Sequence, residues 1–498
     1  MKRWLKVLCL VLVIAFILPS VVACGKKDEA GKTPTGNTGT QTVELPSTVS
    51  GNTYNGASFT IFSVEDMFEK KYFFADATTG DGMNDALYQR QQNIEKNLDI
   101  KFVYKAAEGA GNEAAYQRYA TEIQNAIKNG EEKYQLSLTH AYYDIPTLVE
   151  KDSLKSLDEL ESVAKGMGES YWNKDIMDQV AYKGTHYLGY SNFNLARTYV
   201  IAFNKSLYDE YASAFDGNTM YSYVNEGKWT LSKMSEIAQS VYNDKGNVDS
   251  NVYGLTGEIW VPFIGFMHAA GQSLVTKGED GRYSISWNGN KNVRGALSDL
   301  VSALNNLNKI KETYFWKIKE FNDGKDPTNV TLSGGRAFMQ LMSTNELIGL
   351  TKTSVRFGVV PYPLANTDQY DSTSTGKGYR SLNWAGYLAV PSNITNAALV
   401  GDVIECLSYY SNDVTTYYYE KLLGLKVSEA REDADMLKVV WGSLCSDFGI
   451  TYSMIDTKNM DSLVYSIPRC VMDDKQFTTY ESSFSKPAQN SLDSKINK

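Results

Sequence analysis

Aromatic residues stand beside polar residues at several expected strand ends. Tyr142-Tyr143-Asp144, Glu258-Ile259-Trp260 and Asn383-Trp384 show this pattern. A flat ring offers an apolar surface to the C–H face of a sugar, and a neighbouring carboxylate or amide can bond the sugar hydroxyls. The same rings would also fill a core between helices and a sheet. The pattern therefore predicts either a carbohydrate site or aromatic core packing, and no single ring decides between them.

Other kinds of site lack their usual residues. His140, His186 and His268 show no HxxxH or HExxH spacing, and there is no cysteine cluster, so we expect no zinc site. The sequence contains no GxSxG elbow and no phosphate-binding loop. One sequence cannot show whether two carboxylates converge as in a glycosidase. We expect neither a metal nor a cofactor.

Strands and helices alternate along the part of the chain that would carry these residues. Residues 58–63, 100–104 and 134–139 are rich in β-forming residues. Apolar residues recur at helical spacing over 84–97 and 115–127. The order strand, helix, strand, helix, strand predicts an α/β domain with largely parallel pairing.

A polar joint lies in the middle of the chain. Residues 182–185 (YKGT) predict a tight turn in which the glycine takes a positive φ. Residues 186–188 predict a short strand, 189–194 are polar, and 198–203 predict a second strand before a helix that begins at Asn204. We interpret this joint as the first crossing between two lobes, with the ligand beside it.

The N-terminus has the pattern of an exported lipoprotein. Lys2, Arg3 and Lys6 precede an apolar stretch over 7–18, which is too short for a spanning helix with a stop-transfer flank. Val21-Val22-Ala23-Cys24 then places a small residue directly before a cysteine. We expect residues 1–23 to be a lipoprotein signal peptide and Cys24 to carry the lipid, for example palmitate.

Composition limits the partners of the mature chain. Residues 24–55 are rich in Gly, Thr, Lys, Ser and Pro, which predicts a flexible tether. The formal charge of −9 becomes −12 when the three basic residues of the signal are removed, which argues against nucleic acid as a partner. Cys406, Cys445 and Cys470 lack CxxC spacing; we expect buried thiols, although a pair among them is not excluded by the sequence.

Several short motifs follow one another in the order found in a known family. They are Tyr182–Tyr187 (YKGTHY), Ala202–Tyr208 (AFNKSLY), Lys228–Thr230 (KWT), Gly335–Met339 (GRAFM) and Phe357–Pro363 (FGVVPYP). With these motifs the chain resembles the extracellular solute-binding lipoproteins of bacterial ABC importers, in the carbohydrate-binding branch that includes maltose-binding protein. Phe203 stands where that branch usually has a tyrosine.

The resemblance implies a fold, a function and a location. The fold would be α/β, with two lobes and a hinged cleft as in type II periplasmic binding proteins. Lobe one would comprise 56–190 plus 340–380, and lobe two 194–338 plus 385–490. The protein would be a non-enzymatic monomer on the extracellular face of the cell membrane, held there by its lipid. It would close on a carbohydrate, such as an oligosaccharide, and deliver it to a permease.

The resemblance also implies which residues face the cleft. Trp260, Tyr142 and Trp384 would stack on the ligand, and the others would bond its hydroxyls. The full set is Glu65, Asp66, His140, Tyr142, Asp144, Asn192, Asn194, Arg197, Glu258, Trp260, Asn345 and Trp384. Asn345 would lie at a second crossing and Trp384 at a third. His140 could equally make a structural hydrogen bond, and Arg197 could equally form a surface ion pair.

Two other functions remain open from the sequence. One is a secreted glycan-acting hydrolase, which requires a close carboxylate pair in the cleft with one perturbed member. The other is a binding protein that serves a sensor kinase instead of a permease. The sequence does not identify the sugar, its linkage or its length.

Overall fold

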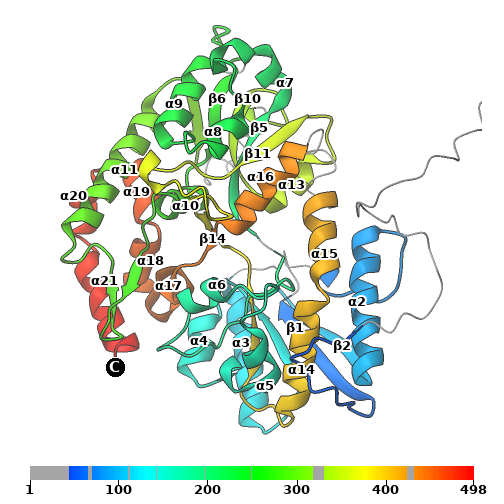
Figure 1. The fold of residues 1–498 in the computed structure, drawn as a ribbon. Coiled ribbons are helices and arrows are strands. Elements are labelled where there is room, and N and C mark those ends of the chain that lie inside the picture. Colours follow the sequence, from blue (N-terminus) through cyan, green and yellow to red (C-terminus); the bar gives the residue numbers. More distant parts are fainter. Residues whose placement is uncertain are drawn as a thin grey trace, which may run out of the picture. The chain divides into compact units, whose positions relative to one another are not determined.

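A computed structural model describes residues 44–498 apart from 65–69, 110–112, 142, 196, 248–249, 318–329 and 423–430. The expected signal peptide, Cys24, Glu65, Asp66 and Tyr142 lie outside the described residues. Residues 44–498 form one compact unit that contains two five-stranded sheets (Figure 1). No described helix is both long and apolar enough to cross a membrane.

The first sheet has the strand order β2-β1-β3-β13-β4. Its strands are β1 (Ala57–Val64), β2 (Ile100–Ala107), β3 (Leu136–Thr139), β4 (Leu154–Lys155) and β13 (Tyr387–Pro391). β1 is parallel to β2 and to β3, which confirms the parallel pairing predicted for this domain, and β13 joins antiparallel to β3 and β4. The helices around it are α2 (Gly82–Leu98), α3 (Glu113–Lys128), α4 (Ile145–Glu150), α5 (Glu161–Gly166), α6 (Lys174–Gln179), α14 (Ala397–Tyr409) and α15 (Asn412–Thr416) (Figure 1).

The second sheet has the order β11-β5-β10-β6-β9. Its strands are β5 (Tyr199–Asn204), β6 (Tyr253–Glu258), β9 (Thr313–Trp316), β10 (Ala337–Ser343) and β11 (Phe357–Val360). β6 is parallel to β9 and β10, whereas β5 runs antiparallel to β10 and β11. The helices near it are α7 (Lys205–Glu210), α8 (Met220–Asn225), α9 (Leu231–Ser240), α10 (Val261–Ala269), α11 (Lys291–Lys309), α13 (Thr344–Leu350) and α16 (Arg431–Gly442).

A helical C-terminal region and two short sheets complete the unit. The helices are α17 (Phe448–Thr451), α18 (Thr457–Val464), α19 (Ser466–Met472), α20 (Phe477–Glu481) and α21 (Ser485–Ser491). β12 (Ser381–Leu382) pairs with β14 (Leu444–Cys445), and β7 (Val275–Lys277) pairs with β8 (Tyr283–Ile285). α19 packs against α10 and α11, so this region is attached to the second sheet.

The sheet membership of two strands differs from the expected lobe boundaries. β11 was expected in lobe one and pairs with β5 of the second sheet; β13 was expected in lobe two and pairs with β3 of the first. Asn345 accordingly lies in α13, between two strands of the second sheet, and not at a crossing. The chain returns to the first sheet only over 361–386. The predicted lobe assignments of β11 and β13 were wrong because the sequence of a short hydrophobic strand does not indicate which sheet the strand will join.

The predicted joint is largely confirmed at its two ends. Lys183 and Gly184 both have positive φ, and Tyr182 and Thr185 exchange two backbone hydrogen bonds in a tight turn. β5 follows, and Asn204 caps α7 by accepting from the N–H groups of Ser206 and Leu207. The short strand expected over 186–188 does not form. The nearby backbone makes isolated bridges instead, among them one between Gly189 and Leu388 of β13.

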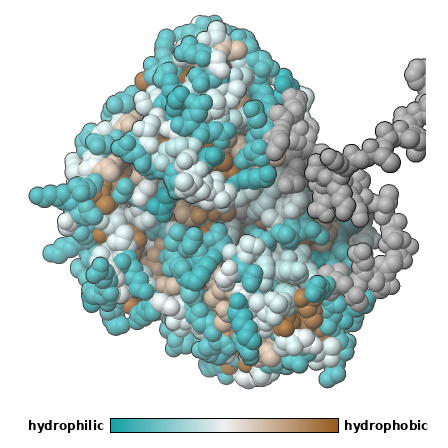
Figure 2. Space-filling model, in the orientation of Figure 1, coloured by the Kyte–Doolittle hydropathy of each residue, from teal (hydrophilic) through white to brown (hydrophobic). Residues whose placement is uncertain are grey.

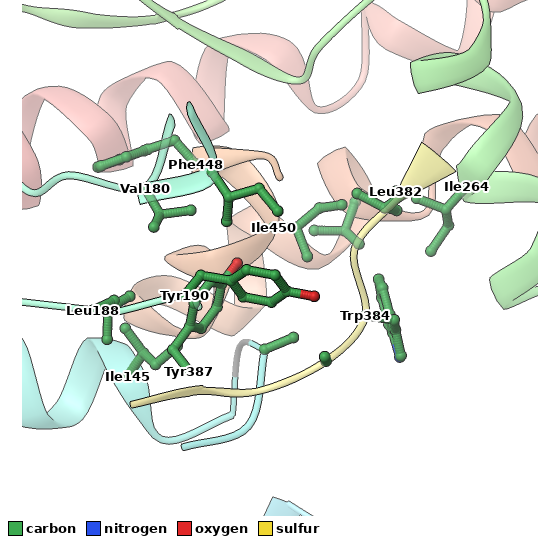
Figure 3. Close-up of a cluster of buried hydrophobic side chains, with 14 of the residues drawn as sticks. Ile145, Val180, Leu188, Tyr190, Ile264, Leu382, Trp384, Tyr387, Phe448 and Ile450 are labelled. Atoms are coloured by element: carbon green, nitrogen blue, oxygen red, sulfur yellow. The ribbon is translucent and has the colours of Figure 1, made fainter. Parts of the chain in front are cut away.

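Aromatic and aliphatic side chains from both halves form a continuous core at the crossings. Figure 3 shows one cluster in which Tyr190 of the first crossing and Tyr387 of β13 lie beside each other, with Trp384 farther along the return segment. The two tyrosine rings are 6.1 Å apart. Cys406, Cys445 and Cys470 are buried and free, as predicted. Because the crossings carry core residues, the two sheets fold as one compact unit.

Candidate functional site

A cavity of about 550 Å³ lies between elements of the first sheet and the C-terminal helices. It falls in the size range usual for small-ligand sites. Its lining residues are Glu113 of α3, Tyr143 after β3, and Ser453, Met454, Thr457, Lys458, Asp461, Ser462, Val464, Tyr465 and Arg469 of the C-terminal region. Figure 2 shows patches of hydrophobic surface at mid-height of the same unit, where elements of the two sheets meet. Most residues that line the cavity are polar or charged, and Tyr143 and Tyr465 are its aromatic residues.

An aromatic platform adjoins this cavity. Trp260, at the N-terminus of α10, stacks on Tyr465 with ring centroids 4.4 Å apart and planes 12° apart. The Arg469 guanidinium lies 5.8 Å from the Trp260 ring centroid and 6.0 Å from that of Tyr465. Arg469 also pairs with Asp461 at 2.5 Å. Two flat rings, a guanidinium and a carboxylate are the groups that can recognise a sugar ring and its hydroxyls.

Two carboxylates and a tyrosine gather at the end of the second sheet. Glu258 ends β6, Tyr199 begins β5, and Glu346 lies in the first turn of α13. The antiparallel register sets Tyr199 opposite Ser343, at the point where α13 begins. Burial and the neighbouring Glu346 raise the pKa of Glu258 to about 7. Its Oε1 is buried and has no hydrogen-bond partner among the described residues.

Glu346 is engaged in the structure of its own helix. Its Oε2 accepts from the Ser343 N–H at 2.6 Å and from the Ser343 hydroxyl at 2.8 Å, in a capping box that starts α13. The pKa of Tyr199 is raised, mainly by burial and then by Glu346, with the charge of Arg197 acting in the opposite direction. The tyrosine hydroxyl therefore stays protonated and can donate a hydrogen bond.

His140 is a neutral, buried residue. Its ring lies 5.0 Å from that of Tyr116 and 4.5 Å from that of Tyr143. Burial, together with the positive charge of Arg197, lowers its pKa to about 3. Its backbone N–H donates to Asp144 Oδ1 at 3.0 Å, and Asp144 is itself fully buried. His140 and Asp144 thus support the loop that carries Tyr143 to the cavity.

The predicted residues at the crossings make structural contacts in this conformation. The Asn194 side chain accepts from the Ser191 N–H and donates to the Gly386 carbonyl, each at 3.0 Å, so it ties the two crossings together. Trp384 is 6% exposed, and its backbone N–H donates to the Arg197 carbonyl at 2.6 Å. Asn192 donates to the Asn412 side chain at 3.1 Å. These groups hold the joint and do not line the 550 Å³ cavity.

Some residues of this candidate site were among those predicted from the sequence, and others were not. Glu258 and Trp260 lie at the aromatic and acidic cluster, and Asn345 is the neighbour of Glu346. Tyr199, Glu346, Tyr465 and Arg469 were not predicted. Tyr199 was assigned only to a strand, and the region after residue 450 contains no recognisable motif. The one signal that could have indicated the position of Tyr199 is that a tyrosine begins a strand directly after a crossing.

Comparison with known proteins shows similarity of fold. No protein-family model matches the sequence, and neither does any curated protein. The solved structure of the sugar-binding protein MalE from Xanthomonas citri matches with a TM-score of 0.58 and 11% identity, over 88% of this chain and 98% of that one. This chain has the ABC substrate-binding-protein fold. It is an α/β fold with two lobes, as predicted.

Two further structures with this substrate-binding-protein fold carry different ligands. An ABC substrate-binding protein from Listeria monocytogenes, in complex with cycloalternan, matches with a TM-score of 0.51 and 16% identity, over 88% of this chain and 98% of that one. UgpB from Mycobacterium tuberculosis, in complex with glycerophosphocholine, matches with a TM-score of 0.52 and 15% identity, over 89% and 100%. The fold is thus shared by proteins with an oligosaccharide ligand and by one with a glycerophosphodiester.

Proposed function

We propose that this protein is a non-enzymatic solute-binding protein that captures a carbohydrate for an ABC transporter. The observation that carries the proposal is the Trp260–Tyr465 platform beside the 550 Å³ cavity, in a chain with this fold. Closure of the two lobes would bring Glu113 and Tyr143 from the side of the first sheet towards Arg469 and the platform on the side of the second sheet, around the ligand. An oligosaccharide fits this set of side chains better than a single sugar ring does, because the aromatic and the acidic residues come from separate elements of the fold.

A screen of ligands by thermal shift tests the proposal. Oligosaccharides, amino acids, peptides, polyamines and glycerophosphodiesters are added in parallel, and a ligand of the folded state raises the melting temperature. We expect stabilisation by oligosaccharides. Stabilisation by peptides or by glycerophosphodiesters alone would contradict the sugar assignment.

Replacing the platform tests the site. Trp260→Ala should weaken the binding of the stabilising sugar about 10–100-fold, which corresponds to ~1.4–2.7 kcal/mol, because the ring loses its stacking contact with the ligand. Isothermal titration measures the dissociation constants. Tyr409→Ala is the matched control, since Tyr409 is an exposed ring on α14 that does not line the cavity. Equal affinities in the two variants would place the sugar site elsewhere.

The hydrolase alternative rests on the two carboxylates at Glu258 and Glu346. One of them is perturbed, as that alternative requires. Glu346, however, is held by the backbone and hydroxyl of Ser343, so it is committed to the start of α13. A binding role therefore fits the geometry better. Release of smaller sugars from the stabilising oligosaccharide, followed by chromatography, would reverse this preference.

We further propose that the chain is a lipoprotein of the cell membrane, exposed on the extracellular side and paired with a permease. The support is the Val21–Cys24 pattern after a basic and apolar leader. Cys24→Ala should abolish labelling of the protein with radioactive palmitate and release it from the membrane fraction. Cys406→Ala serves as the control, because Cys406 is a buried thiol. Unchanged labelling of Cys24→Ala would contradict lipidation at this residue.

A further inference from the structure

A second cavity, of about 160 Å³, lies beside the first crossing and shares no lining residue with the larger one. Its walls come from the segment before α6, from the first crossing, from α15 and the turn that follows it, and from the end of α16 and β14. The lining residues are Ser170, Tyr171, Trp172, Asn173, Tyr190, Ser191, Asn192, Asn194, Thr415, Tyr419, Trp441 and Leu444. The set contains five aromatic residues and no charged one.

Two polar groups of this cavity are buried without a hydrogen-bond partner among the described residues. They are the Tyr190 hydroxyl and the Trp441 indole N–H. Tyr190 is 4% exposed. A buried donor without a partner costs about 1–3 kcal/mol, and each such group in a native protein calls for an explanation. Both residues line the same cavity, so a single occupant can accept from both.

Several other polar groups of the cavity make hydrogen bonds within the protein. Tyr171 and Trp172 donate to Glu405, at 2.5 and 2.9 Å. The Asn173 side chain accepts from the Ile176 N–H at 3.0 Å, and the Thr415 hydroxyl donates to the Asn192 carbonyl at 2.9 Å. These internal bonds fix the walls, and the buried side-chain donors of the lining that have no partner among the described residues are those of Tyr190 and Trp441.

We propose that this cavity binds one neutral monosaccharide. The aromatic walls suit the C–H faces of a sugar ring, and the two spare donors suit its oxygens. The absence of charge among the lining residues disfavours anions and cations. The volume equals that of roughly five water molecules, which is room for a single ring and not for an oligosaccharide.

Occupancy of this site would act on the hinge. The sugar would touch the first crossing at Tyr190 and Asn194, and also Leu444 of β14, which pairs with β12 on the return segment. A change of hinge angle moves these segments relative to one another, so a bound ring favours the angle at which the cavity keeps this shape. The 160 Å³ cavity would therefore be an effector site, distinct from the 550 Å³ cavity that we propose for the transported sugar.

The test uses D-glucose, D-galactose and D-xylose at millimolar concentration with the full chain carrying Trp260→Ala, which removes the platform of the cleft. At least one of the three sugars should still raise the melting temperature. Adding Tyr190→Phe to the Trp260→Ala protein should weaken the binding of that sugar about 3–10-fold, which is the effect of losing one neutral hydrogen bond. Ser170→Trp, which places a large side chain at the exposed rim, should abolish the shift.

The design separates loss of binding from loss of folding. Tyr190→Phe removes a hydroxyl that has no partner, so the sugar-free variant should melt no lower than its parent. The proposal is overturned if none of the three sugars stabilises the Trp260→Ala protein, or if Tyr190→Phe and Ser170→Trp respond like their parent. A crystal soaked with the stabilising sugar that shows only water in the cavity would overturn it as well. None of these outcomes depends on which ligand the cleft takes.

Discussion

Asp447→Ala is expected to lower the free energy of unfolding by about 3–5 kcal/mol, the usual cost of breaking a buried pair by removing one partner. Asp447 Oδ2 lies 2.9 Å from His268 Nε2 and accepts from the Leu274 N–H at 2.7 Å. Its Oδ1 accepts from the Gly449 N–H at 2.7 Å and so caps α17. Both side chains of the pair are fully buried. Alanine would leave His268 and two backbone donors without their acceptor.

Urea unfolding measures this loss, and the chain provides a matched control. Asp473 pairs with Lys475 at 2.9 Å, but both side chains are about half exposed. Asp473→Ala should therefore change stability by less than about 1 kcal/mol, as for other surface pairs. If the two variants unfold at the same urea concentration, the buried Asp447 pair contributes no more to stability than a surface pair, which would contradict this prediction.

Glu258→Gln is expected to stabilise the protein at pH 8 by about 2–3 kcal/mol, and to have little effect at pH 4.5. The pKa of Glu258 is raised from 4.5 to about 7 by burial first and by Glu346 second. A group with a raised pKa in the folded state favours folding below its unfolded pKa, and that contribution is lost as the pH rises through the folded value. Between pH 4.5 and about 7 the wild-type protein should therefore lose stability from this group, and glutamine should remove that loss.

Urea unfolding at the two pH values gives the difference between variant and wild type. Glu346→Gln separates the two causes, because it removes the charge of the neighbour but leaves the burial of Glu258. The loss of stability that Glu258 causes between pH 4.5 and pH 8 should be smaller in Glu346→Gln and absent in Glu258→Gln. A constant difference between Glu258→Gln and wild type from pH 4.5 to pH 8 would show that the pKa of Glu258 is not raised.

Local features of the fold could be predicted because they depend on neighbours along the chain. Thr230, in the KWT motif, accepts from the Lys233 N–H as the cap of α9, and the apolar residues of that helix, Leu231, Met234, Ile237 and Ala238, recur at helical spacing and are buried. The tight turn at Tyr182–Thr185 also follows from its own residues. Capping and glycine conformation act over a few residues, so a sequence pattern is sufficient for them.

The partners of a strand could not be predicted in the same way. β13 inserts between β3 and β4, far earlier in the chain, whereas β11 completes the second sheet. Both strands are short, apolar and fully buried, so each satisfies the pattern equally well in either sheet. The choice is made by packing among distant elements, and this is why the lobe boundaries over 340–380 and 385–490 were misplaced.

The sequence by itself determined the α/β alternation, the crossing before β5, and the position of Glu258 and Trp260 at the end of a strand. Only the tertiary structure decided that Trp260 stacks on Tyr465 and that Glu346 lies near Glu258, because Tyr465 and Glu346 belong to elements that are distant from β6 in the sequence. It also decided that Trp384 and Asn194 hold the crossings. The physical reason is that periodicity records which side chains are buried or exposed, whereas a site depends on which side chains meet.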